Sequence, residues 1–148
     1  MFSANDQILS RTIAERSMQF SALLDRLETR DGIPRATARD LLDGATKDGT
    51  TAVLFTDEPH RCPESWDAAV VFPELLRSLE RPPRARVLAP DESRGAARRC
   101  GVVKYPSIAV LHDGACVGVL EGMRDWSAFP AEFAALLAGA GVAREDGR

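Results

Sequence analysis

The chain has 148 residues, a formal net charge of −3, 45% hydrophobic residues and 28% charged residues. These values are typical of a soluble globular domain with one core. No apolar run is long enough to span a bilayer, and no stripe of basic residues indicates nucleic-acid binding. The N-terminus has no basic start followed by an apolar core, so we expect a cytoplasmic protein without a secretory signal.

The first 32 residues predict a long amphipathic helix over residues 3–30. The apolar residues near one face of this helix are Leu9, Ile13, Phe20, Leu24 and Leu27. Gly32 and Pro34 predict its end, because neither residue continues a helix well. This extension, residues 1–32, either packs on the core or forms an arm for dimerisation or partner binding.

Residues 33–138 alternate between predicted strands and helices. The expected elements are an edge strand at 33–35, a helix at 37–45, strands at 51–56 and 85–89, helices at 64–79 and 93–100, strands at 108–111 and 117–120, and a helix from Asp125 or Ser127 to about 138. Strands joined through helices are expected to be parallel, whereas the last two form an antiparallel hairpin. The order predicts an α/β three-layer sandwich with a mixed central sheet, and residues 139–148 are expected to be a flexible tail.

Two prolines and one turn distinguish this order of elements from other α/β orders. Pro73 lies inside the predicted helix at 64–79 and should kink it near Ala69. Tyr105-Pro106 precedes the first hairpin strand, where a proline is tolerated and is a candidate for the cis form. Asp113-Gly114 suits the two-residue turn of the hairpin.

With these features the chain resembles the thioredoxin fold over about residues 33–138. The segment from Gly101 to Ser107 is similar to the thioredoxin segment that carries a cis-proline. The resemblance implies that Pro106 is cis. It also implies that Tyr105, Pro106 and Gly122 line the groove in which thioredoxins hold an extended peptide.

The thiol pair of thioredoxins is absent. Counting back from Pro73, its two positions fall at about Ser65 and Ala68, and Cys62 stands alone nearby. Three cysteines with irregular spacing make a disulfide framework or a zinc site improbable, so we expect Cys100 and Cys116 to be buried inert thiols. His60 and Cys62 supply too few ligands for a metal, and we expect no cofactor.

A narrower resemblance is to the HyaE/HupG (HoxO) hydrogenase-expression family. It rests on the loop Asp-x-Pro-x-Arg-x-Pro-Glu from Asp57 to Glu64, the Pro-Glu-Leu-Leu-Arg that follows, the aromatic-Pro hairpin start, and Gly-Val-Leu-x-Gly before Trp126. The resemblance implies a non-catalytic chaperone of a nickel–iron hydrogenase small subunit. The implied partners are the precursor, its twin-arginine signal peptide and other hydrogenase maturation factors.

Two groups of side chains are candidates for binding such a partner. Four carboxylates between residues 57 and 67 either form a solvated surface or pair with the signal arginines, whose planar guanidinium donates two hydrogen bonds to a carboxylate. Four apolar side chains either pack singly or form a patch for the hydrophobic part of the signal peptide. These are Trp66, Tyr105, Met123 and Trp126. The predicted partner-binding residues are Asp57, Glu58, Arg61, Glu64, Trp66, Asp67, Tyr105, Pro106, Gly122, Met123 and Trp126.

Two other functions stay open. Cys62 could act as the thiol of a single-cysteine redox protein, although the neighbouring carboxylates disfavour a thiolate. Alternatively, the chain is a structural subunit that dimerises through residues 3–30.

Overall fold

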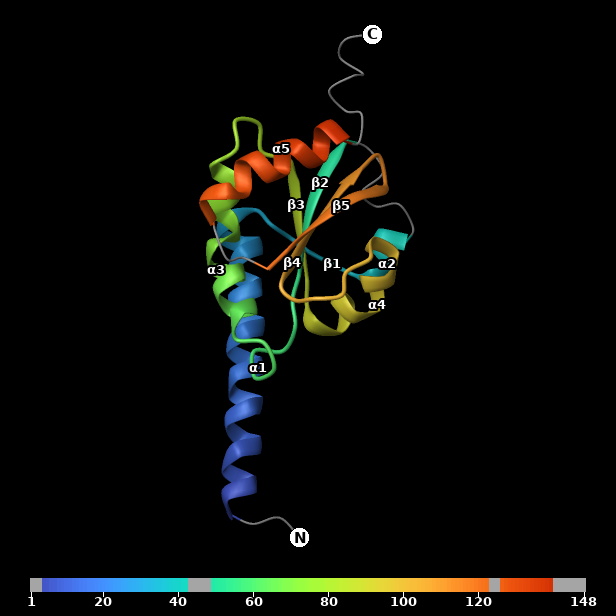
Figure 1. Cartoon of the computed structure of the whole chain (residues 1–148). Helices are drawn as coiled ribbons and strands as arrows, with labels where there is room; N and C mark the ends of the chain where they lie inside the picture. The colour runs from blue at the N-terminus through green and yellow to red at the C-terminus, as the bar shows by residue number, and fades with distance from the viewer. Residues whose placement is uncertain (1–3, 43–48, 123–125, 140–148) are drawn as a thin grey trace.

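The computed structural model describes residues 4–42, 49–122 and 126–139 as a sheet of five strands with helices on both faces (Figure 1). The elements are α1 (Ala4–Asp31), β1 (Arg35–Ala36), α2 (Ala38–Leu42), β2 (Thr50–Phe55), α3 (Glu64–Arg77), β3 (Arg84–Leu88), α4 (Pro90–Cys100), β4 (Ser107–His112), β5 (Ala115–Glu121), the 3₁₀ turn η1 (Trp126–Ala128) and α5 (Phe129–Gly139). The order of elements is the one that the sequence predicts. Asp125, Met123 and residues 140–148 lie outside the described residues.

The sheet is mixed, with the strand order β1-β3-β2-β4-β5. β3 pairs in parallel with both β1 and β2, which are connected to it through helices. β4 pairs antiparallel with β2 and with β5. The expected parallel strands and the expected antiparallel hairpin are therefore both confirmed.

Alternate residues of the central strand β2 build two cores. Ala52 and Leu54 face the larger cluster, in which Phe20 and Leu24 of α1 pack with Phe72 of α3. Val53 and Phe55 belong to the smaller cluster on the other face, beneath α2 and α4. This alternation follows from the period of two residues in a strand, and burial on both faces explains the continuous apolar run of β2.

Local sequence signals place the element ends. Thr37 and Asp40 exchange hydrogen bonds, the Thr37 amide to Asp40 Oδ2 at 2.8 Å and the Asp40 amide to Thr37 Oγ1 at 3.0 Å. This capping box satisfies free amides at the start of α2. Asp113 and Gly114, with φ angles of 51° and 88°, form the tight turn of the hairpin.

Some boundaries differ from the prediction by a few residues. α4 begins at Pro90 rather than at residue 93, because a proline fits the first turn of a helix, where its missing amide has no partner to lose. The edge strand is Arg35–Ala36 rather than residues 33–35. No helix in the described part of the chain is long and apolar enough to cross a membrane.

Candidate functional site

The loop before β4 holds the peptide bond that the sequence singles out. The Tyr105–Pro106 bond is cis, as predicted. Pro106 is buried, and its carbonyl accepts a hydrogen bond of 2.9 Å from the Gly122 amide at the end of β5. The Ser107 hydroxyl donates to the Lys104 carbonyl at 2.6 Å. The structure therefore brings Pro106 and Gly122 together, and local hydrogen bonds fix the loop between them.

The loop after β2 is organised around Asp57. The Asp57 amide donates to the Ser65 hydroxyl at 2.9 Å, and the Asp57 carboxylate accepts from the Glu58 amide at 2.8 Å. Arg61 and Arg94 approach the same carboxylate oxygen at 2.9 Å and 3.5 Å. Burial alone would raise the pKa of Asp57. The hydrogen bonds from Arg61 and the Glu58 amide, with the charges of both arginines, lower this pKa below its usual range.

Glu58 is engaged as well, but with α1. Its carboxylate accepts a hydrogen bond of 2.9 Å from the Ser17 hydroxyl. A cavity of about 170 Å³ lies between α1 and this loop, and its lining includes Ser17, Glu58 and Asp91. Asp57 and Glu58 are therefore held by side chains of this chain, and α1 is tied directly to the acidic loop.

Glu64 and Asp67 stand apart from these two carboxylates. Both are exposed on the first turn of α3, and neither forms an ion pair within residues 4–42, 49–122 and 126–139. A carboxylate at a helix N-terminus is stabilised by the helix dipole. Both carboxylates are therefore exposed to solvent at the start of α3.

Cys62 lies beside the cis peptide bond. Its thiol donates to the Tyr105 carbonyl at 3.2 Å and lies 3.7 Å from a Glu64 carboxylate oxygen. Ser65 and Ala68, the positions at which the sequence comparison with thioredoxins predicts the thiols, are completely buried. Ser65 therefore serves as a hydrogen-bond acceptor for the loop.

The two described aromatic side chains of the predicted apolar patch pack in different places. Trp66 contacts Phe20 of α1, with 5.9 Å between the ring centroids, and belongs to the larger core cluster. Tyr105 packs against the smaller cluster, and burial raises its pKa, with a further increase from the charge of Asp57. Met123 and the side chain of Trp126 lie outside the described residues.

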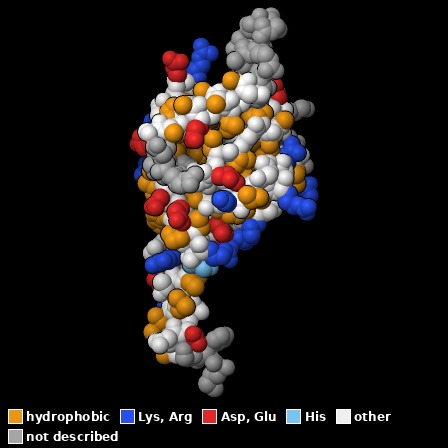
Figure 2. All heavy atoms as spheres, in the orientation of Figure 1, with side chains coloured by type: hydrophobic (Ala, Val, Ile, Leu, Met, Phe, Trp, Pro, Cys, Tyr) orange, Lys and Arg blue, Asp and Glu red, His pale blue; other side chains and the backbone are white. Residues whose placement is uncertain are grey.

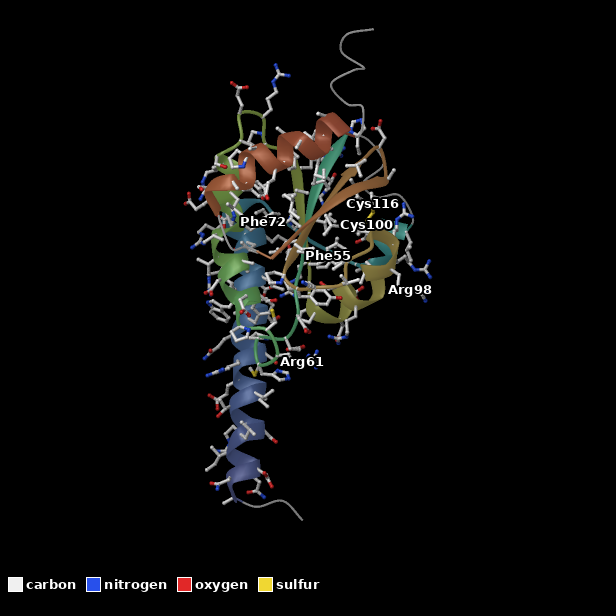
Figure 3. The ribbon with its side chains drawn as sticks, in the orientation of Figure 1. Phe55, Arg61, Phe72, Arg98, Cys100 and Cys116 are labelled. Carbon is white, nitrogen blue, oxygen red and sulfur yellow. A yellow bond between two sulfur atoms is a disulfide. The ribbon has the colours of Figure 1, made fainter. Side chains whose placement is uncertain are left out.

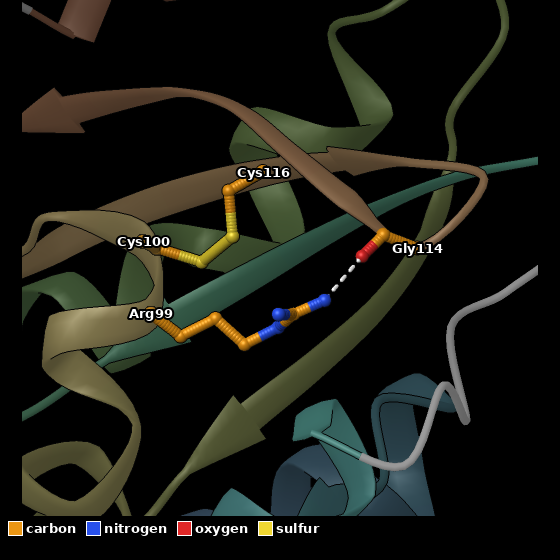
Figure 4. The surroundings of a disulfide bond; sticks show 4 residues. All are labelled: Arg99, Cys100, Gly114 and Cys116. Carbon is orange, nitrogen blue, oxygen red and sulfur yellow. Dashed lines mark hydrogen bonds between the residues drawn. A yellow bond between two sulfur atoms is a disulfide. The ribbon is translucent and has the colours of Figure 1, made fainter.

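The expectation of inert thiols at Cys100 and Cys116 is wrong. The two residues form a disulfide, with 5.4 Å between their Cα atoms, which joins the end of α4 to β5 (Figures 3 and 4). The neighbouring Arg99 donates to the Gly114 carbonyl at 2.7 Å and supports the same contact. An odd cysteine count hides this pair, because the third cysteine, Cys62, remains free.

No group of three His, Cys, Asp or Glu side chains that could hold a metal occurs within the described ranges. His60 is exposed on the loop. The sequence interpretation missed three parts of the site, namely Arg94, Ser17 and the contact between Cys62 and Tyr105. Each joins segments far apart in the chain, so the local sequence carries no signal for them.

The fold and the site define a thioredoxin-fold protein in which the start of α3 carries no thiol pair. The same fold occurs in a mutant thioredoxin from Halobacterium salinarum NRC-1, with a TM-score of 0.55 and 17% identity over 70% of this chain and 88% of that one. The family model described as hydrogenase-1 expression protein HyaE matches residues 23–129. The chain belongs to this family of hydrogenase expression proteins.

Individual relatives agree with this assignment. A hydrogenase expression/formation protein HoxO from Cupriavidus necator is 33% identical over 137 residues, which cover 82% of this chain and 85% of the relative. A hydrogenase expression/formation protein HupG from Bradyrhizobium diazoefficiens is 32% identical over 105 residues, covering 68% of this chain and 71% of the relative.

Proposed function

We propose that this protein is a non-catalytic chaperone that acts in the cytoplasm on the precursor of a nickel–iron hydrogenase small subunit. It holds the twin-arginine signal peptide of the precursor before assembly and export. Family membership supports the hydrogenase as the client. The arrangement around Pro106 supports an extended peptide as the bound segment, because this loop lies beside the end of β5 and the start of α3.

One observation supports a cationic peptide as the bound segment. Glu64 and Asp67 present two exposed carboxylates on the first turn of α3, next to Cys62 and the cis peptide bond. Two arginines in sequence can each meet one carboxylate, and an arginine binds a carboxylate through two parallel hydrogen bonds. Asp57 is already bound by Arg61 and Arg94, so it supports the loop and leaves the client arginines to Glu64 and Asp67.

Co-purification tests the proposal directly. The full chain is expressed with a tagged small-subunit precursor that carries its signal peptide, and separately with a precursor that lacks it. We expect recovery of the first complex and loss of most of the second. Absence of binding to both forms would contradict the chaperone function, and equal binding to both would contradict the signal peptide as the bound segment.

A second function is favoured by the position of Cys62 alone. Its thiol faces the Tyr105 carbonyl beside Pro106, where a bound peptide would pass. In a thiol–disulfide exchange, the Cys62 thiolate would attack one sulfur of a client disulfide, form a mixed disulfide and release the other sulfur as a thiolate. Formation of a mixed disulfide between Cys62 and a model disulfide, absent in Cys62→Ser, would support this redox function over the non-catalytic one.

A further inference from the structure

The apolar face of α1 continues beyond the part of the helix that the body covers. Phe20 and Leu27 are 2% and 1% exposed, whereas Leu9 is 60% exposed. Figure 1 shows the N-terminal part of α1 projecting past the sheet, and Figure 2 shows hydrophobic side chains along this part. A helical segment of this length is marginally stable in water by itself, so a second surface that covers it stabilises it.

The residues on this projecting face have a symmetric order. Asp6, Leu9, Ile13 and Arg16 follow one another at intervals of three, four and three residues. Since a helix turns about 100° per residue, these four side chains share one face, the same face that carries Phe20 further along. Asp6 and Arg16 are both exposed, at the two ends of the apolar pair.

This order is complementary to itself when a second helix runs in the opposite direction. With the two copies crossing at Arg11, each Leu9 meets the Ile13 of the second copy, and each Asp6 meets the Arg16 of the second copy. Arg11 itself points away, because it is about 200° from Leu9 around the helix. A parallel pair would instead place Asp6 against Asp6 and Arg16 against Arg16, and like charges destabilise such contacts.

We propose that two copies of this chain associate through the projecting halves of α1 in an antiparallel pair. The two bodies do not compete for space in this arrangement. Ser17, where the body first contacts α1 through Glu58, lies six residues from the crossing point, which is about 9 Å along the axis. The two bodies therefore lie at opposite ends of the paired helices, and the loop that carries Pro106 is not part of the paired surface.

Charge reversal tests this pairing. The mass of the full chain is measured by sedimentation or light scattering over a range of concentrations, and we expect twice the chain mass of 16.1 kDa. Arg16→Glu places two glutamates opposite two aspartates and should weaken the dimer at least tenfold. Asp6→Arg should do the same, whereas the double variant Asp6→Arg/Arg16→Glu should restore it.

Two further variants complete the experiment. Arg26→Glu makes the same charge change at an exposed position of α1 away from this face, and it should leave the dimer intact. Leu9→Glu/Ile13→Glu should give a folded monomer, with its fold checked by circular dichroism. A wild type that stays monomeric at all concentrations would overturn the proposal, and so would a dimer that Arg16→Glu leaves unchanged. If the wild type is monomeric and Leu9→Glu/Ile13→Glu loses only signal-peptide binding, the face binds the client and the proposal is also overturned.

Discussion

The loop from Gly101 to Pro106 lies between two sulfur-containing regions that differ in chemistry. At its start, Cys100 is joined to Cys116 of β5 by a disulfide. At its end, the free thiol of Cys62 donates a hydrogen bond to the Tyr105 carbonyl. The covalent bond therefore stabilises the fold at the α4 side of the loop, whereas the thiol lies beside the cis peptide bond and takes part in a hydrogen bond.

The largest expected effect is loss of the disulfide. Cys100→Ser with Cys116→Ser should lower the free energy of unfolding by about 3 kcal/mol, because the bond closes a loop of 16 residues and restricts the unfolded chain. Denaturant unfolding measures the change. Treatment of the wild type with a reductant should reproduce it. Identical stability of the oxidised and reduced wild-type protein would show that this bond does not support the fold.

Ser65→Ala should have a smaller effect, a loss of about 1–2 kcal/mol. The variant leaves the Asp57 amide without the hydroxyl that accepts its hydrogen bond at a completely buried position. The same unfolding experiment measures it. Ser78→Ala is the control. Ser78 is exposed and its hydroxyl donates to the Leu75 carbonyl, so we expect the free energy of unfolding to change by less than about 0.5 kcal/mol. Equal losses in both variants would contradict a supporting role for Ser65.

Cys62→Ser should change stability by less than about 1 kcal/mol, because serine keeps a donor for the Tyr105 carbonyl and a thiol is a weak donor. Denaturant unfolding compares the stability of this variant with that of the Cys100 and Cys116 variants. An equally large loss of unfolding free energy would contradict the different roles of the two sulfur regions. Binding of the signal peptide should persist in Cys62→Ser if the function is non-catalytic.

The smallest expected effect concerns Asp57 and pH. The pKa of Asp57 is lower in the folded protein than in the unfolded chain, so its contribution to stability is present above about pH 4. This contribution is lost as pH falls through the lower pKa of the folded state. Asp57→Asn should therefore be less stable than the wild type by about 0.5 kcal/mol or less at neutral pH, and the difference should narrow in acid. A difference that is constant between pH 7 and pH 2 would contradict this account.

The sequence predicts much of the fold because its signals are local. The apolar run of β2, the Asp113-Gly114 turn and the Thr37–Asp40 pair each specify a strand, a turn or a helix start within a few residues. The site depends on contacts between distant segments. Cys100 and Cys116 meet because the end of α4 lies beside β5, and the cysteine count alone argues against that bond.

The sequence also does not predict the directions in which the side chains of the site point. Trp66 turns toward Phe20, because the long α1 helix packs along α3 and covers the indole. Arg94 reaches Asp57 from a helix that lies 37 residues further along the chain. A sequence pattern shows which residues are charged or aromatic, but the packing of α1 and α4 decides which of them a partner can reach.

The most direct test of the proposed function is a titration of the full chain with two labelled signal peptides that differ only in Arg-Arg against Lys-Lys. The wild type should bind the arginine peptide more tightly. Glu64→Gln/Asp67→Asn should weaken that binding about tenfold, equivalent to about 1.4 kcal/mol, and abolish the preference. The control Glu80→Gln/Glu132→Gln makes the same charge change at exposed positions away from the start of α3 and should bind as the wild type does. Equal affinity of the wild type for both peptides, or unchanged binding in Glu64→Gln/Asp67→Asn, would contradict recognition of the signal arginines at the start of α3.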